Sequence, residues 1–302
     1  MHSRPLPKQA ILVVNAASRT GADAFALARE KLVAAGIDLL DAIAVEQPDT
    51  MGHAVQDAVA RAPMVIVGGG DGSLSTNIDP FMGKETVFAL LPLGTANSFA
   101  RTMGIPLDID GAVEVIANGE PRPISLGCID GEYFLNAAAL GLAPKVAETV
   151  PHRLKRRLGR VGYLMWAGWS AASFKAFRVL VEVGGRRHRL WATEVRIANG
   201  RFHGGMELIE SADPESSEIV IQAVRGRSVI RLGFSYLASA LKLARREENV
   251  REFRGKKLRL STRPPMQVSI DGELGPTTPL DISALPDAVV MAAPRAKPSR
   301  DG

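Results

Sequence analysis

Short apolar runs alternate with segments of helical periodicity in the first part of the chain. Residues 21–36 and 50–62 carry apolar side chains at helical spacing, and a glycine stands where the first of these helices should end. Strands that are apolar throughout and alternate with helices indicate a parallel sheet covered on both faces. The pattern predicts a doubly wound, three-layer α/β domain over residues 1–123. Its expected strands are 11–15, 39–46, 64–69 and 86–94, and its further expected helices are 73–83, 95–104 and 108–119.

The pattern changes near residue 121, where strand-like runs begin to follow one another. Turn signals separate these runs, which is typical of an antiparallel β domain. Helical stretches near 153–176 and 230–248 interrupt it, and the polar residues 294–302 read as a flexible tail. The expected strands are 124–129, 132–141, 176–184, 188–200, 218–226, 257–263, 266–272 and 287–293.

Length and composition agree with two soluble domains. The chain has 302 residues, of which 46% are hydrophobic and 23% charged. It has one cysteine, Cys128, so no internal disulfide forms. Neither a secretory signal nor a run of about 20 apolar residues that could span a membrane is visible. We therefore expect a cytoplasmic protein.

Basic residues are unevenly distributed. The net charge is only +5, but basic clusters stand at 153–160 and 242–259. Such clusters meet nucleic acid, anionic lipid or phosphorylated substrates, or are simply solvated. Residues 151–178 begin basic and continue with aromatic side chains. This stretch suits either a helix at a membrane surface or a core helix with a solvated basic end.

A glycine-rich loop ends the third expected strand, in the sequence MVIVGGGDGS at 64–73. The spacing fits neither the dinucleotide fingerprint nor the lysine-containing phosphate loop. One interpretation is a glycine turn whose backbone N–H groups approach a phosphate, while Asp71 handles a hydroxyl or a magnesium ion. The other is a tight strand–helix turn in which Asp71 caps a helix.

A second loop, LPLGTANSFARTMGIP at 91–106, also ends a strand in a glycine. The two loops together resemble the diacylglycerol kinase catalytic family, which includes bacterial lipid kinases, sphingosine kinases and ceramide kinases. The segment Gly69–Ser73 resembles the family's Gly-Gly-Asp-Gly-Thr loop, and 92–101 resembles its second signature. A late Asp-Gly-Glu turn, Asp271 to Glu273, is similar to the third.

The sequence IDGE occurs twice, at 129–132 and 270–273. Asp-Gly is a common two-residue hairpin turn, so we expect a hairpin at both places. Only the second copy has the position and neighbours of the family motif. We therefore assign chemistry to Asp271 and Glu273, and only a turn to the first copy.

The resemblance extends over nearly the whole chain and implies a fold. Family members have an α/β nucleotide domain followed by a β-sandwich-like domain, with the nucleotide in the cleft between them. Here these domains would be 1–123 and 124–286. A strand near 287–293 would return to complete the first domain.

The resemblance also implies roles for individual residues. Glu273 would accept the proton of a lipid hydroxyl, with Asp271 beside it, and Asp71 would orient the nucleotide, its magnesium ion or the acceptor. The cofactors would be ATP and Mg²⁺. The residues that would bind the nucleotide are Asn15, Ser18, Gly69, Gly70, Gly72, Ser73, Gly94, Thr95 and Asn97.

Several positions depart from the family pattern. Ala16 and Arg19 replace the proline and glycine usual in the first-strand motif, and Ser75-Thr76 replace Asn-Glu. Ser98 and Ser125 stand where aspartates are usual. Glu215-Ser216-Ser217 replace an Asp-Asp-Gly sequence tied to a structural magnesium ion in some members. We therefore assign no residue to a metal site.

These features favour an ATP-dependent lipid kinase. The acceptor would be diacylglycerol, a sphingoid base, ceramide or a related lipid alcohol, met at the inner face of the membrane. We expect no nucleic-acid partner, and the oligomeric state, including a homodimer, stays open. The alternatives are an NAD kinase-like enzyme and a catalytically inactive module that binds nucleotide or lipid.

Overall fold

The computed structural model of the chain describes residues 5–17, 19–141, 175–225 and 250–295. Of the sequence predictions, Ser18, most of the two helical stretches, most of the stretch 151–178 and the end of the tail lie outside the described residues. The chain forms two compact units, and each is described by itself. Unit 1 comprises 1–126, 200–217 and 285–302, and unit 2 comprises 127–199 and 218–284.

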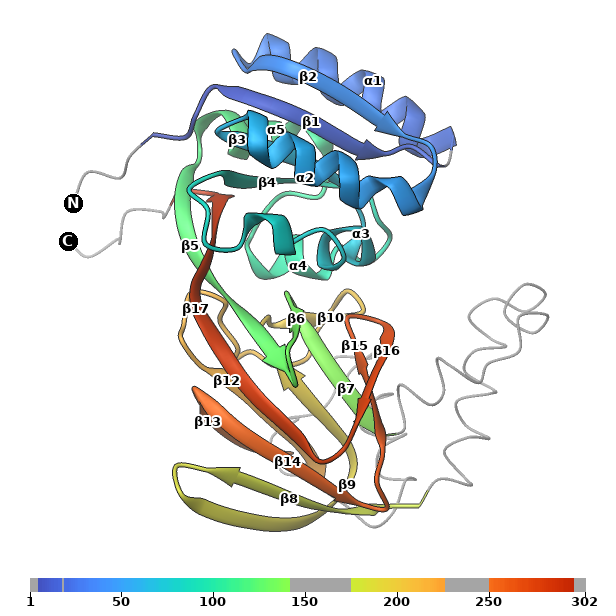
Figure 1. The fold of residues 1–302 in the computed structure, drawn as a ribbon, viewed down its shortest axis with the longest axis vertical. Helices are drawn as coiled ribbons and strands as arrows, with labels where there is room; N and C mark the ends of the chain where they lie inside the picture. The colour runs from blue at the N-terminus through green and yellow to red at the C-terminus, as the bar shows by residue number, and fades with distance from the viewer. Residues whose placement is uncertain (1–4, 18, 142–174, 226–249, 296–302) are drawn as a thin grey trace, which may run out of the picture. The chain divides into compact units, whose positions relative to one another are not determined.

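Unit 1 is built on a parallel sheet (Figure 1). Strands β1, β3 and β4 are buried along almost their whole length, whereas β2 at the sheet edge is mostly half-buried or exposed. The strand order is β2-β1-β3-β4, and Met291 at the end of the long strand β17 (Leu280–Ala293) pairs in parallel with Phe88 of β4. Helices on both faces explain why the strands are apolar throughout. The bounds are β1 Gln9–Asn15, β2 Asp38–Val45, β3 Met64–Gly69 and β4 Val87–Pro92.

The long helices of unit 1 cover the sheet. Helices α1 (Arg19–Ala34) and α5 (Ile109–Asn118) pack against each other, and α2 (Met51–Arg61) covers the other face of the sheet (Figure 1). Asp108 begins α5 by accepting a hydrogen bond from the Gly111 N–H at 2.8 Å. The predicted α/β fold class is confirmed.

Two predicted helices are shorter than expected. The expected helix 73–83 is divided into α3 (Asp71–Ser75) and a 3₁₀ turn, Asp79–Phe81, because Pro80 cannot continue a helix. The expected helix 95–104 is only α4 (Ser98–Thr102), since a turn with Asn97 in the left-handed region precedes it. A further 3₁₀ turn, Pro48–Thr50, leads into α2.

The segment 200–217 belongs to unit 1, although the sequence analysis placed it in the second domain. It carries a small hairpin of β10 (Phe202–His203) and β11 (Met206–Glu207). The Gly205 N–H donates to the Ser98 hydroxyl at 3.0 Å, and the Phe202 N–H donates to the Thr102 hydroxyl at 3.3 Å. These contacts join residues about 100 positions apart in the sequence, so the local sequence pattern could not reveal them.

Unit 2 is an antiparallel β sandwich. In one layer the first half of β9 pairs with β8, β8 pairs with β14, and β14 pairs with β17. In the other layer the second half of β9 pairs with β7 and with β12. Strand β9 thus belongs to both layers, and an apolar cluster drawn from both layers forms the core. Strand β5 (Glu120–Ile129) begins in unit 1 and ends in unit 2. The other bounds are β6 Glu132–Phe134, β7 Ala137–Gly141, β8 Phe177–Val183, β9 Arg186–Ala198, β12 Ile219–Arg225, β13 Val250–Gly255, β14 Lys257–Arg263, β15 Gln267–Ile270 and β16 Glu273–Thr277.

Both copies of IDGE form two-residue turns, as predicted. Asp130 and Gly131 join β5 to β6, and Asp271 and Gly272 join β15 to β16. All four residues have positive φ angles, of 49° and 95° in the first turn and 46° and 100° in the second. This is the geometry that the Asp-Gly pair favours between antiparallel strands.

Candidate active site

The two glycine loops of unit 1 lie against each other where β3 and β4 end. A Cβ atom on Gly94 would lie 2.5 Å from the Gly70 Cα, closer than any two such atoms approach. The Leu93 N–H also donates to the Gly69 carbonyl at 2.9 Å. The two loops are therefore in contact. Glycine is needed at Gly94 for the backbones to approach this closely, and a Cβ on Gly70 would also be crowded, at 3.1 Å from the Gly94 Cα.

Asp71 holds the second loop. Its two carboxylate oxygens accept hydrogen bonds from the backbone N–H groups of Ser98 at 2.9 Å and Phe99 at 3.0 Å. These N–H groups open α4 and have no partner within that helix. The carboxylate thus caps α4, which follows the second loop. It does not cap α3, the helix in which Asp71 itself lies.

Asn97 stabilises the second loop from within. Its side chain is only 5% exposed, and its φ angle is 46°. The amide oxygen accepts from the Gly94 N–H at 2.9 Å, and the amide nitrogen donates to the Gly94 carbonyl at 2.8 Å. The side chain of Asn97 therefore fixes the loop, whereas the neighbouring Thr95 is exposed.

The first loop is packed on one side and open on the other. Asn15, at the end of β1, donates to the Ser73 hydroxyl at 3.2 Å. A Cβ on Gly69 would lie 2.6 Å from the Ser73 Cβ, so the protein itself requires that glycine. A Cβ on Gly72 would meet nothing within 4 Å, and Gly72 is not among the residues with a positive φ angle. Neither packing nor backbone geometry explains this glycine, but a ligand that closely approaches the backbone would.

The two carboxylates of the late hairpin in unit 2 have different surroundings. The Asp271 oxygens accept from the backbone N–H groups of Leu135 and Ala137, both at 3.0 Å. Glu273 is exposed, and its side chain has no hydrogen bond or ion pair with the residues that the structure describes. Asp271 therefore anchors the hairpin on the β6–β7 connection, and Glu273 is the carboxylate that is available to a substrate.

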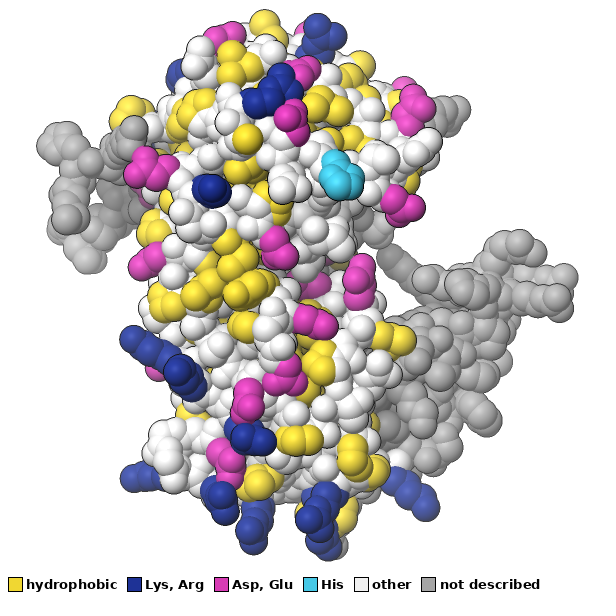
Figure 2. Space-filling model, viewed as in Figure 1, with side chains coloured by type: hydrophobic (Ala, Val, Ile, Leu, Met, Phe, Trp, Pro, Cys, Tyr) yellow, Lys and Arg dark blue, Asp and Glu magenta, His cyan; other side chains and the backbone are white. Residues whose placement is uncertain are grey.

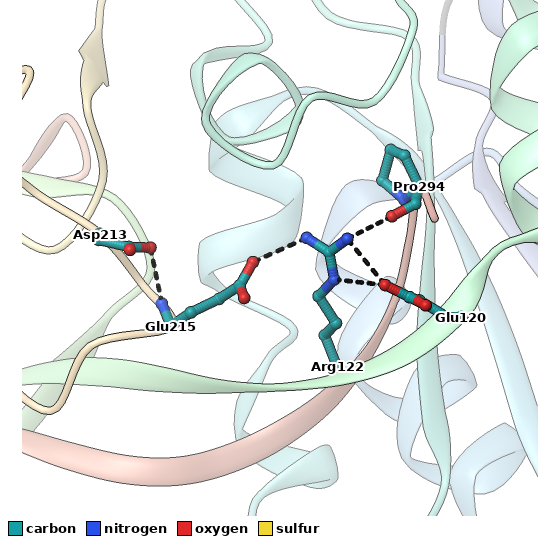
Figure 3. Close-up of polar contacts among 5 residues, drawn as sticks. All are labelled: Glu120, Arg122, Asp213, Glu215 and Pro294. Carbon is teal, nitrogen blue, oxygen red and sulfur yellow. Dashed lines mark hydrogen bonds and ion pairs between the residues drawn. The ribbon is translucent and has the colours of Figure 1, made fainter. Parts of the chain in front are cut away.

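Direct bonds occupy the positions where some family members hold a structural metal ion. The Ser125 hydroxyl donates to the Ser216 carbonyl at 2.6 Å. Arg122 donates to Glu215 at 2.8 Å and to Glu120 at 2.9 Å, and it also bonds the Pro294 carbonyl (Figure 3). These side chains do not fit a magnesium ion, because an arginine cation already bonds the Glu215 carboxylate.

The pKa of Arg122 reflects these contacts. Partial burial lowers the pKa, but the hydrogen bonds and charges of Glu120 and Glu215 outweigh burial, so the pKa of Arg122 lies above its usual value. The guanidinium therefore stays charged at neutral pH.

The structure adds Ser98 and Gly205 to the residues that shape the second loop. A hairpin turn at the Gly204-Gly205 pair could have been predicted from the sequence. The packing of this turn on α4 could not have been predicted, because the contact uses the backbone N–H of Gly205, a group that every residue except proline carries.

Two absences among the described residues bear on function. No three His, Cys, Asp or Glu side chains in that part of the chain lie together as a metal site. Among the same residues, no helix has both the length and the apolar character needed to cross a membrane.

The fold and the paired loops define a protein with a glycine-loop α/β unit and a β-sandwich unit. The Diacylglycerol kinase catalytic domain family matches residues 9–129. The family described as YegS C-terminal NAD kinase beta sandwich-like domain matches residues 136–293, more than half of the chain. The chain therefore belongs to the family of proteins that combine these two domains, and the resemblance seen in the sequence is confirmed.

Individual relatives agree with this assignment. A Bacillus subtilis protein named diacylglycerol kinase is 26% identical over 262 residues, which are 81% of this chain and 82% of the relative. A Yersinia pestis protein named probable lipid kinase YegS-like is 31% identical over 58% of this chain, but the match spans only 60% of the relative. A match with an uncharacterized Synechocystis protein spans 54% of that relative.

Solved structures support the fold. The crystal structure of a putative diacylglycerol kinase from Bacillus anthracis superposes with a TM-score of 0.78 over 95% of each chain. The sequence identity is 24%, so this likeness concerns the fold alone.

Proposed function

We propose that this chain is an ATP-dependent lipid kinase that transfers the γ-phosphate to the hydroxyl group of a lipid alcohol. Membership of the family supports a kinase of this class. The observation that carries the proposal is the pair of touching glycine loops, in which Gly72 leaves the backbone open although the protein does not require a glycine there.

The loops fit a nucleotide triphosphate. Backbone N–H groups of Gly69–Ser73 and of Gly94-Thr95, together with the Ser73 hydroxyl, would bind phosphate oxygens. Phosphoryl transfer needs positioning and neutralisation of charge more than covalent chemistry, so a rigid backbone cradle suits it. The bonds of Asp71 and Asn97 hold the second loop in place without a ligand. Asn97 therefore acts as a positioning residue, and Asp71 holds the loop in addition to any contact with the ligand.

Magnesium would reach the site with the nucleotide. Mg²⁺ keeps several waters and is commonly bound by one or two carboxylates together with substrate phosphates, so it needs no cage of protein ligands. When bound, the ion would neutralise charge on the phosphate oxygens. Asp71 is the carboxylate of the glycine loops and would be its protein ligand, because its oxygens retain lone pairs beyond those that accept the two N–H groups.

Glu273 would supply the general base. The lipid hydroxyl oxygen would form a bond to the γ-phosphorus as the bond between that phosphorus and the ADP oxygen breaks, and Glu273 would accept the hydroxyl proton. Asp271 would hold the turn that presents Glu273, because its own oxygens accept two backbone N–H groups.

Transfer of radiolabel from the γ-position of ATP tests the proposal. The acceptors would be diacylglycerol, a sphingoid base, ceramide and NAD, each with and without Mg²⁺. We expect label on a lipid, lost by a factor of about 100 or more in Glu273→Gln, as is typical of losing a general base. The matched control is Glu132→Gln, which changes the equivalent exposed residue of the first IDGE turn and should keep activity.

The other results contradict the proposal. Label on NAD alone would indicate an NAD kinase, and no label on any acceptor would indicate an inactive module. Full activity of Glu273→Gln would exclude Glu273 as the base.

A further inference from the structure

One face of unit 2 carries a regular array of cations. Strands β9, β8 and β14 lie side by side, and the register places Trp191, Arg178 and Arg263 in one cross-strand row. A second row is Arg189, Leu180 and Ser261, and a third is Arg187, Glu182 and Arg259. We name this surface the basic face; it comprises these nine residues together with Lys257, Asp281 and Ser283 where β14 meets β17.

The basic face is the outer surface of its layer. Side chains alternate along a strand, and the intervening residues Val179, Val181 and Leu260 are buried in the core. Every Lys and Arg of the face is exposed. The dark blue side chains gathered where β8 and β14 are labelled show this concentration of positive charge (Figures 1 and 2).

Carboxylates neutralise only part of the charge. The face has six cations, Arg178, Arg187, Arg189, Lys257, Arg259 and Arg263, and two carboxylates. Arg187 pairs with Glu182, and Arg259 pairs with Asp281 at 3.4 Å. The other four cations have no carboxylate partner among the residues that the structure describes. They leave a net charge of about +4 on one small surface, which attracts polyanions.

Trp191 adds an amphipathic group to this charge. Its side chain is 37% exposed, and the Arg178 guanidinium lies 5.2 Å from the centroid of its ring. Exposed tryptophan is typical of the boundary between lipid headgroups and acyl chains, where one part of the ring is apolar and the N–H is solvated. The long Arg and Lys side chains around Trp191 can extend to the headgroup phosphates at the depth of its ring.

We propose that the basic face docks unit 2 on an anionic phospholipid surface. The inference rests on the proposed lipid kinase activity, since an acceptor lipid is found in a bilayer. Each basic residue near an anionic membrane strengthens attachment, so four unpaired cations together suffice for reversible binding. A single-stranded nucleic acid is the weaker fit, because such partners need several aromatic side chains for base stacking and this face has one.

Vesicle binding by the full chain tests the proposal. The vesicles would be phosphatidylcholine alone or phosphatidylcholine with about a third phosphatidylglycerol. We expect binding only to the anionic vesicles, weakened about 10-fold or more in Arg189→Gln/Lys257→Gln and lost at high salt. The matched control is Arg29→Gln/Lys84→Gln, which removes two exposed cations of unit 1 and should bind like the unchanged chain.

Three results would overturn the proposal: equal weakening in both double variants, equal binding to both kinds of vesicle, and tighter binding to a single-stranded oligonucleotide than to anionic vesicles. Activity separates this proposal from the lipid kinase function. Arg189→Gln/Lys257→Gln should phosphorylate a detergent-dispersed acceptor at the unchanged rate, so loss of docking with full activity supports docking alone. Absence of phosphorylation in every variant would contradict the kinase proposal and leave the vesicle result as the test of docking.

Discussion

The carboxylate of Asp71 bonds the backbone N–H of Ser98 at 2.9 Å, although the two residues stand 27 positions apart. The carboxylate also accepts a hydrogen bond from the backbone N–H of Phe99. Through these two bonds the first glycine loop stabilises the second. The aspartate inside the glycine loop therefore has a structural task whether or not it also contacts a ligand.

Asp71→Asn should destabilise unit 1. The amide keeps one acceptor oxygen but turns an NH₂ group toward the N–H of Ser98 or Phe99, so one hydrogen bond is lost and a donor faces a donor. We expect a loss of about 1–3 kcal/mol in the free energy of unfolding, measured by urea denaturation, together with weaker ATP binding by calorimetry. Asp79→Asn, which changes an exposed aspartate nearby in the sequence, is the control. An unchanged urea midpoint for Asp71→Asn would contradict the supporting role.

Gly72→Ala and Gly94→Ala should separate ligand binding from folding. A methyl group on Gly94 would press on Gly70, so Gly94→Ala should lower the free energy of unfolding by about 1–3 kcal/mol. A methyl group on Gly72 meets no protein atom, so Gly72→Ala should preserve stability, or raise it by up to about 1 kcal/mol.

The same Gly72→Ala variant should lose ATP binding, because the methyl group would occupy the space into which a phosphate approaches the backbone. Calorimetric titration with ATP measures this. Wild-type affinity in Gly72→Ala would mean that the nucleotide does not approach the loop at this residue.

Asp271→Asn should act on stability, unlike Glu273→Gln. The Asp271 carboxylate bonds the N–H groups of Leu135 and Ala137, and the asparagine can satisfy only one of them. We expect a loss of about 1–3 kcal/mol, seen as a lower urea midpoint, whereas Glu273→Gln should unfold like the unchanged chain. The interpretation fails if the two variants have the same midpoint.

Much of unit 1 could be predicted from the sequence. Strands β1, β3 and β4 are buried along nearly their whole length, so their apolar runs mark them clearly. Strand β13 was missed because only Phe253 of its six residues is buried, and its charged neighbours read as a solvated basic run. An outer strand with a single buried apolar residue lacks the alternation that predicts a strand.

The candidate site was only partly predictable. Glycine and the Asp-Gly pair favour turn conformations that most other residues rarely adopt, so the positions of the loops and turns could be predicted from the sequence. The partners of Asp71 and Asp271 could not, because each bonds backbone N–H groups, which every residue except proline carries. For the same reason the contact of Gly205 with Ser98, and with it the place of 200–217, appears only in the structure.

Unit 1 should keep its stability when metal ions are removed. Arg122 links Glu120, Glu215 and the Pro294 carbonyl, and the Ser125 hydroxyl bonds the Ser216 carbonyl, so the 213–217 loop is held by protein groups alone. A chelator should leave the thermal midpoint unchanged, whereas Arg122→Gln should lower it by about 4 °C or more, because two carboxylates lose their partner. The pKa of Arg122 is raised, so its contribution is complete below the pKa of an unfolded arginine and is lost only as the pH rises through the higher folded value. The difference between Arg122→Gln and the unchanged chain should therefore not fade between neutral and mildly alkaline pH. A midpoint that falls with chelator in the unchanged chain would show that a metal ion holds this loop after all.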